Sequence, residues 1–153
     1  MRKKFPLLFA FSLLAVLTIA QINSNDSLRQ VVLNSPDKDE LIKACIELSA
    51  KFNLTSFDEN IGFARIGLGA AVKKKDSINI AKLYHNLGVA HYFKGNYDSA
   101  AFYYYKSVDI SNAKKDVPLL AEVYNNLGKL YRKIGPYTRS HDFYNKAMEI
   151  YRQ

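Results

Sequence analysis

The sequence predicts an all-α fold, a solenoid of antiparallel helix pairs that follow one another as three units. Two adjacent segments, which start at Asp76 and Asp116, align without a gap at an offset of forty residues. Within each segment, apolar residues recur at spacings of three and four, which marks one face of a helix. The pattern breaks at the same place in both, at Gly95 and at Gly135, so each segment contains two helices. Similarity of this kind between neighbouring segments indicates a repeat protein.

The first twenty residues have the pattern of an export signal. A basic start, Arg2 to Lys4, precedes an apolar run from Phe5 to Ala20. This run is about 16 residues long, whereas a helix that crosses a bilayer needs about 20, and its length is typical of a signal peptide. The sequence therefore predicts a signal peptide at residues 1–20, cleavage before Gln21, and export to the periplasm or secretion. An uncleaved leader that anchors the chain in the inner membrane is the alternative.

A linker, residues 21–36, is predicted between this leader and a helical repeat domain, residues 37–153. The linker is polar apart from Leu28 and a few neighbours that can dock as one turn. Regular structure is expected to begin near Ser35, which can cap a helix that has Pro36 in its first position.

The first unit, residues 37–75, is predicted to be a degenerate copy of the two units that follow it. Ser56 and Glu59 have the spacing of a capping box, which places the start of its second helix just after Ser56. The Lys-Lys-Asp at residues 74–76 returns at residues 114–116. These signals support a helix pair here too.

The second and third units, residues 76–115 and 116–153, repeat each other closely. Helices are expected at about 78–94, 97–114, 117–134 and from 137 to the last residue. Pro118 is tolerable there because it falls in a first turn. The identical pairs include Asp76/Asp116, Ala81/Ala121, Tyr84/Tyr124, Asn86/Asn126, Leu87/Leu127, Gly88/Gly128, Gly95/Gly135, Tyr97/Tyr137, Tyr104/Tyr144, Lys106/Lys146 and Ile110/Ile150.

The composition argues against several classes of function. The chain has 22 Lys and Arg against 14 Asp and Glu, a net charge of +8, and removing the three basic residues of the leader leaves +5. This moderate charge gives no case for nucleic-acid binding. Cys45 is the single cysteine, so no disulfide can form within the chain. The fold must therefore be held together by packing.

The sequence offers no residue set arranged for catalysis, for a metal or for a cofactor. His85 and His91 lie on different sides of one predicted helix, and neither is placed to form a zinc site with His141. The glycine-rich stretch at residues 62–71 falls inside a predicted helix, whereas a dinucleotide-binding loop joins a strand to a helix. Cys45 has no clear activating partner. We therefore expect a protein that is not an enzyme and that uses no metal or cofactor.

Two stretches, NLGVAHYFKGNYDSA from Asn86 and NLGKLYRKIGPYTRS from Asn126, resemble the tetratricopeptide repeat. The resemblance is weak in the first unit, where Leu48 stands in place of the expected glycine. It implies that small residues let the two helices of a unit cross closely while an aromatic ring fills the space beside them. The packing positions it implies are Tyr84, Leu87, Gly88, Ala100, Tyr104, Tyr124, Leu127, Gly128, Tyr144 and Ala147. A leader followed by such repeats is similar to exported proteins of Bacteroidetes-type bacteria.

The same resemblance implies a non-catalytic scaffold that binds a protein or an extended peptide on the concave face of the array. The family's binding positions fall at Lys82, His85, Asn86, Val89, Phe93, Glu122, Asn125, Asn126, Lys129 and Lys133. Asn86 and Asn126 fit a clamp for a terminal carboxylate, but Val89 and Glu122 depart from it, so a peptide backbone is the better ligand. The alternative is the input segment of a longer signal-transduction protein, a histidine kinase or a transcription regulator, whose output module is absent from these residues.

The sequence does not decide what two sets of aromatic and apolar side chains contact. Phe102 and Tyr105 fall where the family carries polar residues, so they contact either a partner or neighbouring side chains. The last helix carries, on the face that would meet a next unit, Phe143, Ala147, Ile150 and Tyr151. Either more repeats follow, or two copies pair through this helix, or its polar residues Asp142, Asn145, Lys146 and Glu149 keep the end soluble unaided. A membrane is expected as a partner only through an uncleaved leader or a missing C-terminal region.

Overall fold

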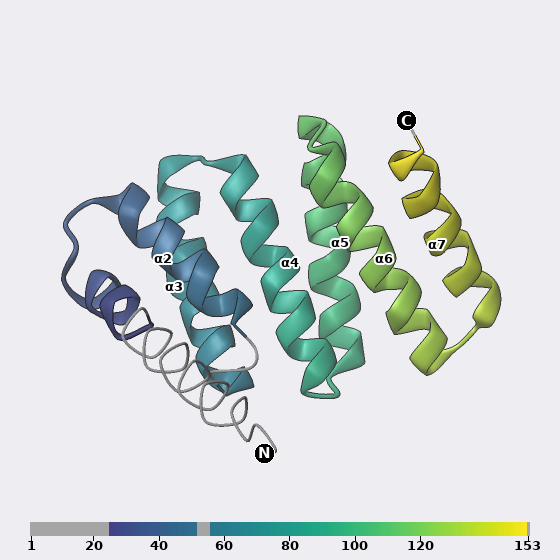
Figure 1. The fold of residues 1–153 in the computed structure, drawn as a ribbon, viewed down its shortest axis with the longest axis horizontal. Coiled ribbons are helices and arrows are strands. Elements are labelled where there is room, and N and C mark those ends of the chain that lie inside the picture. Colours follow the sequence, from purple (N-terminus) through teal and green to yellow (C-terminus); the bar gives the residue numbers. More distant parts are fainter. Residues whose placement is uncertain (1–24, 52–55, 153) are drawn as a thin grey trace, which may run out of the picture.

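The chain folds into a row of helices in chain order, in a computed structural model that describes residues 25–51 and 56–152 (Figure 1). From residue 38 onward the helices are α2 (Lys38–Ala50), α3 (Phe57–Lys74), α4 (Ser77–Phe93), α5 (Tyr97–Lys114), α6 (Val117–Ile134) and α7 (Tyr137–Tyr151). Neither described range contains a strand, which agrees with the predicted all-α class. The predicted signal peptide and its cleavage point lie outside the described residues.

The helices form two layers. Neighbours in sequence pack side by side, so α2 with α3, α4 with α5, and α6 with α7 are the helix pairs of the three units (Figure 1). Among these six helices, the backbone of α4 also comes close to those of α2 and α6, whereas the backbone of α5 comes close to neither α3 nor α7. The first helices of the units are therefore packed more closely than the second helices. This difference curves the array and makes α2, α4 and α6 its concave layer.

Side-chain caps fix where several helices begin. The Ser56 hydroxyl accepts the Glu59 N–H at 3.2 Å, and the Glu59 carboxylate accepts the Ser56 N–H at 3.2 Å, so the predicted capping box is confirmed. Asp76 caps α4 by accepting the N–H of the third residue after it, and Asp116 caps α6 in the same way. These matching caps start α4 and α6 at equivalent points of the repeat.

The start of α2 differs from the prediction. Asp37 caps this helix, because its carboxylate accepts the N–H of Asp39 at 2.7 Å. The Ser35 hydroxyl instead donates to the Glu40 carboxylate at 2.7 Å and accepts the N–H of Asp37. Pro36 therefore precedes the helix and does not occupy its first position. Serine and aspartate are both good capping residues, and the sequence pattern pointed to the earlier one.

The predicted linker is helical over residues 25–34. Asn25 is buried and accepts a hydrogen bond from Lys51 Nζ at 2.9 Å. Arg29 donates to the Glu59 carboxylate at 3.2 Å. These contacts attach the segment to the first unit, so this part of the predicted linker is a packed helix and more than the single turn expected.

The packing positions implied by the resemblance lie between the helices of each unit. Seven of them are buried: Leu87, Gly88, Ala100, Tyr104, Leu127, Gly128 and Ala147. Tyr84, Tyr124 and Tyr144 are partly buried. In the third unit the small residue Ser140 donates its hydroxyl to the Gly128 carbonyl at 2.8 Å, which is possible only where the helices approach closely.

The first unit packs in spite of its missing glycine because two residue sizes are exchanged. Leu48 lies forty residues before Gly88, and Ala64 lies forty residues before Tyr104. Both Leu48 and Ala64 are fully buried. A large residue on α2 and a small one on α3 thus replace the small residue and large ring of the later units. When only the sequences are aligned, this exchange of sizes makes the first unit look like a degenerate copy.

Phe102 and Tyr105, whose contacts the sequence did not decide, both contact neighbouring side chains. The Tyr105 and Tyr131 hydroxyls lie 2.9 Å apart, and the Tyr105 ring lies 6.2 Å from that of Phe143. Phe102 packs edge-on against Tyr103 with ring centroids 5.2 Å apart, although it remains 56% exposed. Tyr105 therefore joins the second unit to the third, and Phe102 rests against its own helix.

The last helix presents only part of the apolar face that was expected. Ala147 is buried, and Phe143 stacks on Tyr131 at 5.5 Å, so the prediction that these two residues face outward was wrong. Tyr151 is exposed as expected, Ile150 is partly buried, and the other exposed apolar side chains of α7 are Tyr137 and Met148. The prediction failed for Phe143 because α5 and α6 offer its ring further aromatic partners, Tyr105 at 6.2 Å and Tyr124 at 6.0 Å.

Candidate binding groove

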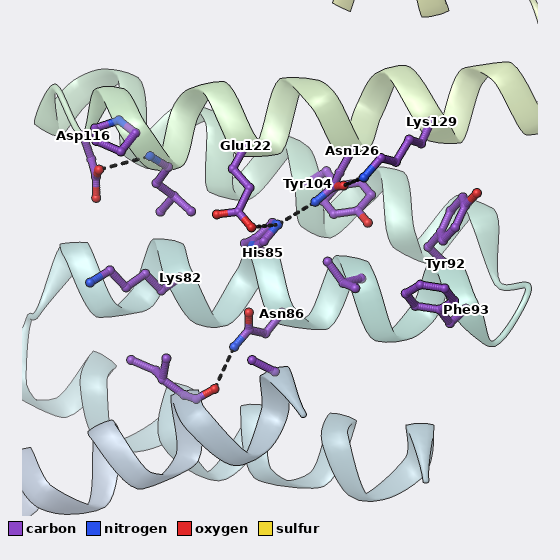
Figure 2. A pocket seen from close by; sticks show the side chains of 15 residues that line it. Lys82, His85, Asn86, Tyr92, Phe93, Tyr104, Asp116, Glu122, Asn126 and Lys129 are labelled. Carbon is purple, nitrogen blue, oxygen red and sulfur yellow. Dashed lines mark hydrogen bonds and ion pairs between the residues drawn. The ribbon is translucent and has the colours of Figure 1, made fainter. Parts of the chain in front are cut away.

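A groove of about 690 Å³ opens on the concave layer between α4 and α6, with α2 on one side (Figure 2). We call it the concave groove. Eight of the ten binding positions implied by the resemblance line it: Lys82, His85, Asn86, Val89, Phe93, Glu122, Asn126 and Lys129. Asn125 and Lys133 are not among the lining residues.

The repeat explains why these side chains meet. Residues three or four apart lie on the same face of a helix, and the α4 and α6 residues of the groove follow that spacing. Further lining residues, not named from the sequence, are Ile46, Ala50, Tyr92, Tyr104, Asp116, Pro118 and Leu119. The offset of forty could have found Ile46, because it corresponds to Asn86. Tyr104 was assigned to packing alone, yet its ring also reaches the groove floor.

His85 lies at the centre of the groove floor, with a side chain that is 8% exposed. Its Nε2 lies 2.8 Å from Nδ2 of Asn126, whose Oδ1 accepts a hydrogen bond from Lys129 Nζ at 3.2 Å. Oε1 of Glu122 lies 3.8 Å from the same Nε2. The Tyr104 ring lies below, with its centroid 6.1 Å from that of the imidazole. Polar groups of α6 thus surround a ring that comes from α4 (Figure 2).

The hydrogen bonds assign the protonation state of His85. Because Lys129 donates to the Asn126 oxygen, the Asn126 amide presents its NH₂ group to the imidazole. Nε2 must then accept, which places the proton of the neutral ring on Nδ1. Burial lowers the pKa of His85; the Glu122 carboxylate opposes this shift and the Lys129 ammonium adds to it. His85 is therefore neutral near neutral pH.

Asn86 is held inside the protein. Its amide NH₂ group donates to the Ile46 carbonyl at 3.1 Å and to the Ser49 hydroxyl at 2.8 Å. Both donors of the side chain are thus used to join α4 to α2 (Figure 2). Asn126, at the equivalent position of the third unit, bonds to the side chains of His85 and Lys129 and is only partly buried. The two asparagines therefore have different roles in spite of their equivalent positions.

The two ends of the concave groove differ in chemistry. Tyr92 and Phe93 lie at one end, with their rings in an edge-on pair at 5.5 Å (Figure 2). Phe93 also stacks on Phe57 of α3 at 5.9 Å. Lys82 and Asp116 lie at the other end, where Asp116 also caps α6 (Figure 2). The arrangement offers an apolar surface, a polar centre and a charged end along one line.

The remaining candidates from the sequence lie away from this groove or in the core. Cys45 is buried, and burial raises the pKa of its thiol to about 11. His91 is buried against Tyr103, with ring centroids 5.3 Å apart. In the part of the chain that the structure describes, no group of three His, Cys, Asp or Glu residues could hold a metal ion. No helix in that part has the length and apolar character needed to cross a membrane.

Comparisons with known proteins agree with this architecture. Residues 79–153 match the model of a family described as the tetratricopeptide repeat. Among solved structures, the TPR domain of FLU from Arabidopsis is similar, with a TM-score of 0.67 and 19% sequence identity. The similarity covers 74% of this chain and 96% of that one, and at this identity it supports the fold alone. None of the curated proteins matches the sequence.

Proposed function

Since the chain belongs to the tetratricopeptide repeat family, we propose that it is a non-catalytic scaffold that binds a protein partner through an extended segment of that partner. The observation that carries the proposal is the concave groove. Its volume of about 690 Å³ falls in the range of ligand sites, which is about 300–1,000 Å³. A groove that runs between two helices suits an extended chain better than a compact molecule.

The lining of the concave groove supports a peptide as the ligand. A peptide backbone carries donors and acceptors at regular intervals, and it needs polar partners at the centre of the groove. Asn126 can supply one amide N–H to such a backbone, because only one of its two is used on His85. The rings of Tyr92 and Phe93 can then take an apolar side chain of the same segment. Asn86 contributes by holding α2 and α4 together and not by direct contact.

A selection of binding peptides tests this proposal. We would select twelve-residue peptides from a random displayed library on the purified protein, and then repeat the binding with Lys129→Glu. A matched control is Lys106→Glu, which makes the same charge change on the exposed side of α5. We expect the groove variant to weaken binding about tenfold and the control to have little effect, because charge reversal at a contact costs about 1–2 kcal/mol. Equal effects of the two variants would contradict binding in the groove.

Export to the periplasm or secretion is part of the same proposal, and it depends on the sequence of residues 1–20. The alternative, an input segment of a longer signal-transduction protein, would use the same groove to receive its partner. Self-association through α7 is also proposed. It is supported by side chains spaced by four and three along that helix: Tyr137, His141, Tyr144, Met148 and Tyr151. This is the spacing of a helix–helix seam.

The spacing on α7 is also self-complementary. In an antiparallel pair of α7 helices centred on Tyr144, Tyr137 of one copy faces Tyr151 of the other. A twofold interface requires such a patch, because the same residues are used on both sides. The equivalent positions of α5 include Tyr97, Ala101 and Val108, which pack against a core that α6 completes. The α7 helix of a second copy would cover these side chains of α7 in the way that α6 covers the equivalent side chains of α5.

A further inference from the structure

We propose that protonation of His85 converts the concave groove into a site for acidic peptide segments, because the hydrogen-bond partner of the imidazole changes from Asn126 to the carboxylate of Glu122. This inference rests on the proposed function, since it concerns what the same groove accepts and when. It follows from the hydrogen-bond directions around one buried ring.

The contact between His85 and Asn126 requires a neutral ring. Asn126 donates to Nε2 at 2.8 Å, while its oxygen is occupied by Lys129 at 3.2 Å. A protonated imidazole carries a hydrogen on Nε2, so two donors would then face each other. The Asn126 amide cannot turn over without losing its bond to Lys129. Protonation of His85 is therefore incompatible with the arrangement at neutral pH.

An alternative partner is already in place. Oε1 of Glu122 lies 3.8 Å from Nε2. Neither atom can donate while the ring is neutral, but a small side-chain rotation brings the carboxylate within hydrogen-bond distance once Nε2 carries a proton. A hydrogen bond between an imidazolium and a carboxylate is shorter and stronger than one between neutral groups. The Glu122 side chain is 58% exposed, so it can turn toward the ring without displacing packed atoms.

The surroundings of the ring contain few other charges. From α6, the ionisable groups near His85 are Glu122 and Lys129, and these two influence its pKa in opposite directions. From α5 the neighbour is Tyr104, and α2 lines the groove with the uncharged Ile46 and Ala50. No groove-lining residue comes from α3, which also packs on α4. On α4 itself Lys82 lies one turn before His85.

Replacing Asn126 with Glu122 as the hydrogen-bond partner of His85 changes the charge of the groove that a ligand contacts. Near neutral pH the lining holds two cations, Lys82 and Lys129, and two anions, Asp116 and Glu122. Asp116 is engaged at the start of α6, where it accepts the Leu119 N–H at 3.3 Å. Pairing Glu122 with a protonated His85 removes the one anion that projects freely, and the two lysines then dominate. A ligand with carboxylates is favoured in that state, and by linkage its binding favours protonation.

Two peptides and four proteins test the inference. The probes are a labelled twelve-residue peptide of alternating Glu and Ala, and the same peptide with Gln in place of Glu. Binding is measured by fluorescence anisotropy from about pH 7.5 to about pH 5, where peptide glutamates remain mostly ionised because their pKa is about 4.3. The proteins are the wild type, His85→Gln, Glu122→Gln, and Glu149→Gln, which removes an exposed carboxylate of α7 as the matched control for Glu122→Gln. Circular dichroism at each pH verifies that every protein stays folded.

We expect the acidic peptide to bind the wild type about fivefold more tightly or better at the low end of this range. The Gln peptide should change little. His85→Gln should bind the acidic peptide equally across the range, and Glu149→Gln should behave as the wild type. Glu122→Gln should bind the acidic peptide more tightly than the wild type near neutral pH and should show a smaller change on acidification.

Nuclear magnetic resonance of the ring nitrogens completes the test without a ligand. The Nε2 signal of His85 should change from an acceptor to a protonated nitrogen at a pH below about 6.5, and the Asn126 side-chain amide signals should move with the same midpoint. Binding of the acidic peptide that does not vary with pH would overturn the inference and leave the groove assignment standing. Failure of both peptides to bind at any pH would count against the groove itself, and would overturn the inference with it.

Discussion

The ring of Tyr104 lies directly over Gly88, where α5 crosses α4. A Cβ atom built on Gly88 would lie 2.5 Å from Cδ1 of that ring and 2.6 Å from Cε1. The same pair recurs forty residues later, because a Cβ on Gly128 would lie 2.7 Å from Cδ1 of Tyr144. Such distances are too short for carbon atoms, so glycine is required here by close approach of the ring.

Adding a side chain at Gly88 should therefore destabilise the protein. We expect Gly88→Ala to lower the free energy of unfolding by about 1–3 kcal/mol, since overpacking forces the buried Tyr104 ring to move. Urea denaturation followed by circular dichroism measures the change. Gly69→Ala is the matched control, because no atom lies within 4 Å of a Cβ at that helical glycine. Equal stabilities of Gly88→Ala and the wild type would contradict the crossing described here.

The first unit suggests a compensating pair. Gly88→Leu combined with Tyr104→Ala copies the exchange seen at Leu48 and Ala64. We expect the double variant to be more stable than the sum of the two single effects predicts, by about 1–3 kcal/mol, as is found for residues in contact. Additive effects in this double-mutant cycle would show that the two positions do not pack against each other.

The regular parts of the fold were predictable from the sequence because their signals are local. The bounds of α5 and α6 agree with the prediction, and Asp116 and Gly135 mark the ends of α6 by capping and by a turn. The role of Asn86 was not predictable in this way. It depends on the position of the Ile46 carbonyl, forty residues earlier, which only the packing of α2 on α4 determines. A pattern can place a side chain on a face, but it cannot say which acceptor lies opposite.

Asn86 should matter for stability more than its equivalent Asn126. Replacing Asn86 with Ala removes two hydrogen bonds between α4 and α2, although Ser49 still donates to the Ile46 carbonyl. We expect a loss of about 1–3 kcal/mol, since each such bond contributes about 0.5–1.5 kcal/mol. Asn126→Ala, the matched control, should cost less because its site is open to water. Chemical denaturation of both variants decides the matter, and a larger loss for Asn126→Ala would contradict the assignment.

Acid should destabilise the fold through His91. Both ring nitrogens of this residue are buried without a hydrogen-bond partner, and burial lowers its pKa, assisted by Arg65 and Lys94. A histidine whose pKa is lower in the folded state stabilises the fold above its unfolded pKa of about 6.5, and this contribution is lost as the pH falls below that value. We expect His91→Phe to reduce the loss of unfolding free energy between about pH 7 and about pH 5. An identical pH slope for wild type and His91→Phe would refute this role.

Pairing through α7 can be tested directly in solution. We expect the chain without residues 1–20 to sediment as a dimer at high micromolar concentration, and Met148→Glu to make it monomeric by placing a charge in the apolar seam. Glu149→Lys is a control for a charge change at the neighbouring position. A wild-type monomer at every concentration would contradict self-association.

The most direct measurement of the central claim is site-specific photo-crosslinking in the cell that makes the protein. A photoreactive phenylalanine is placed at Val89, in the concave groove, and in a second variant at Phe102, on the exposed side of the outer layer. The account predicts that irradiation joins a partner protein to position 89, and that Lys129→Glu in the same chain reduces the yield. Crosslinking of the partner through position 102 with none through position 89 would contradict it.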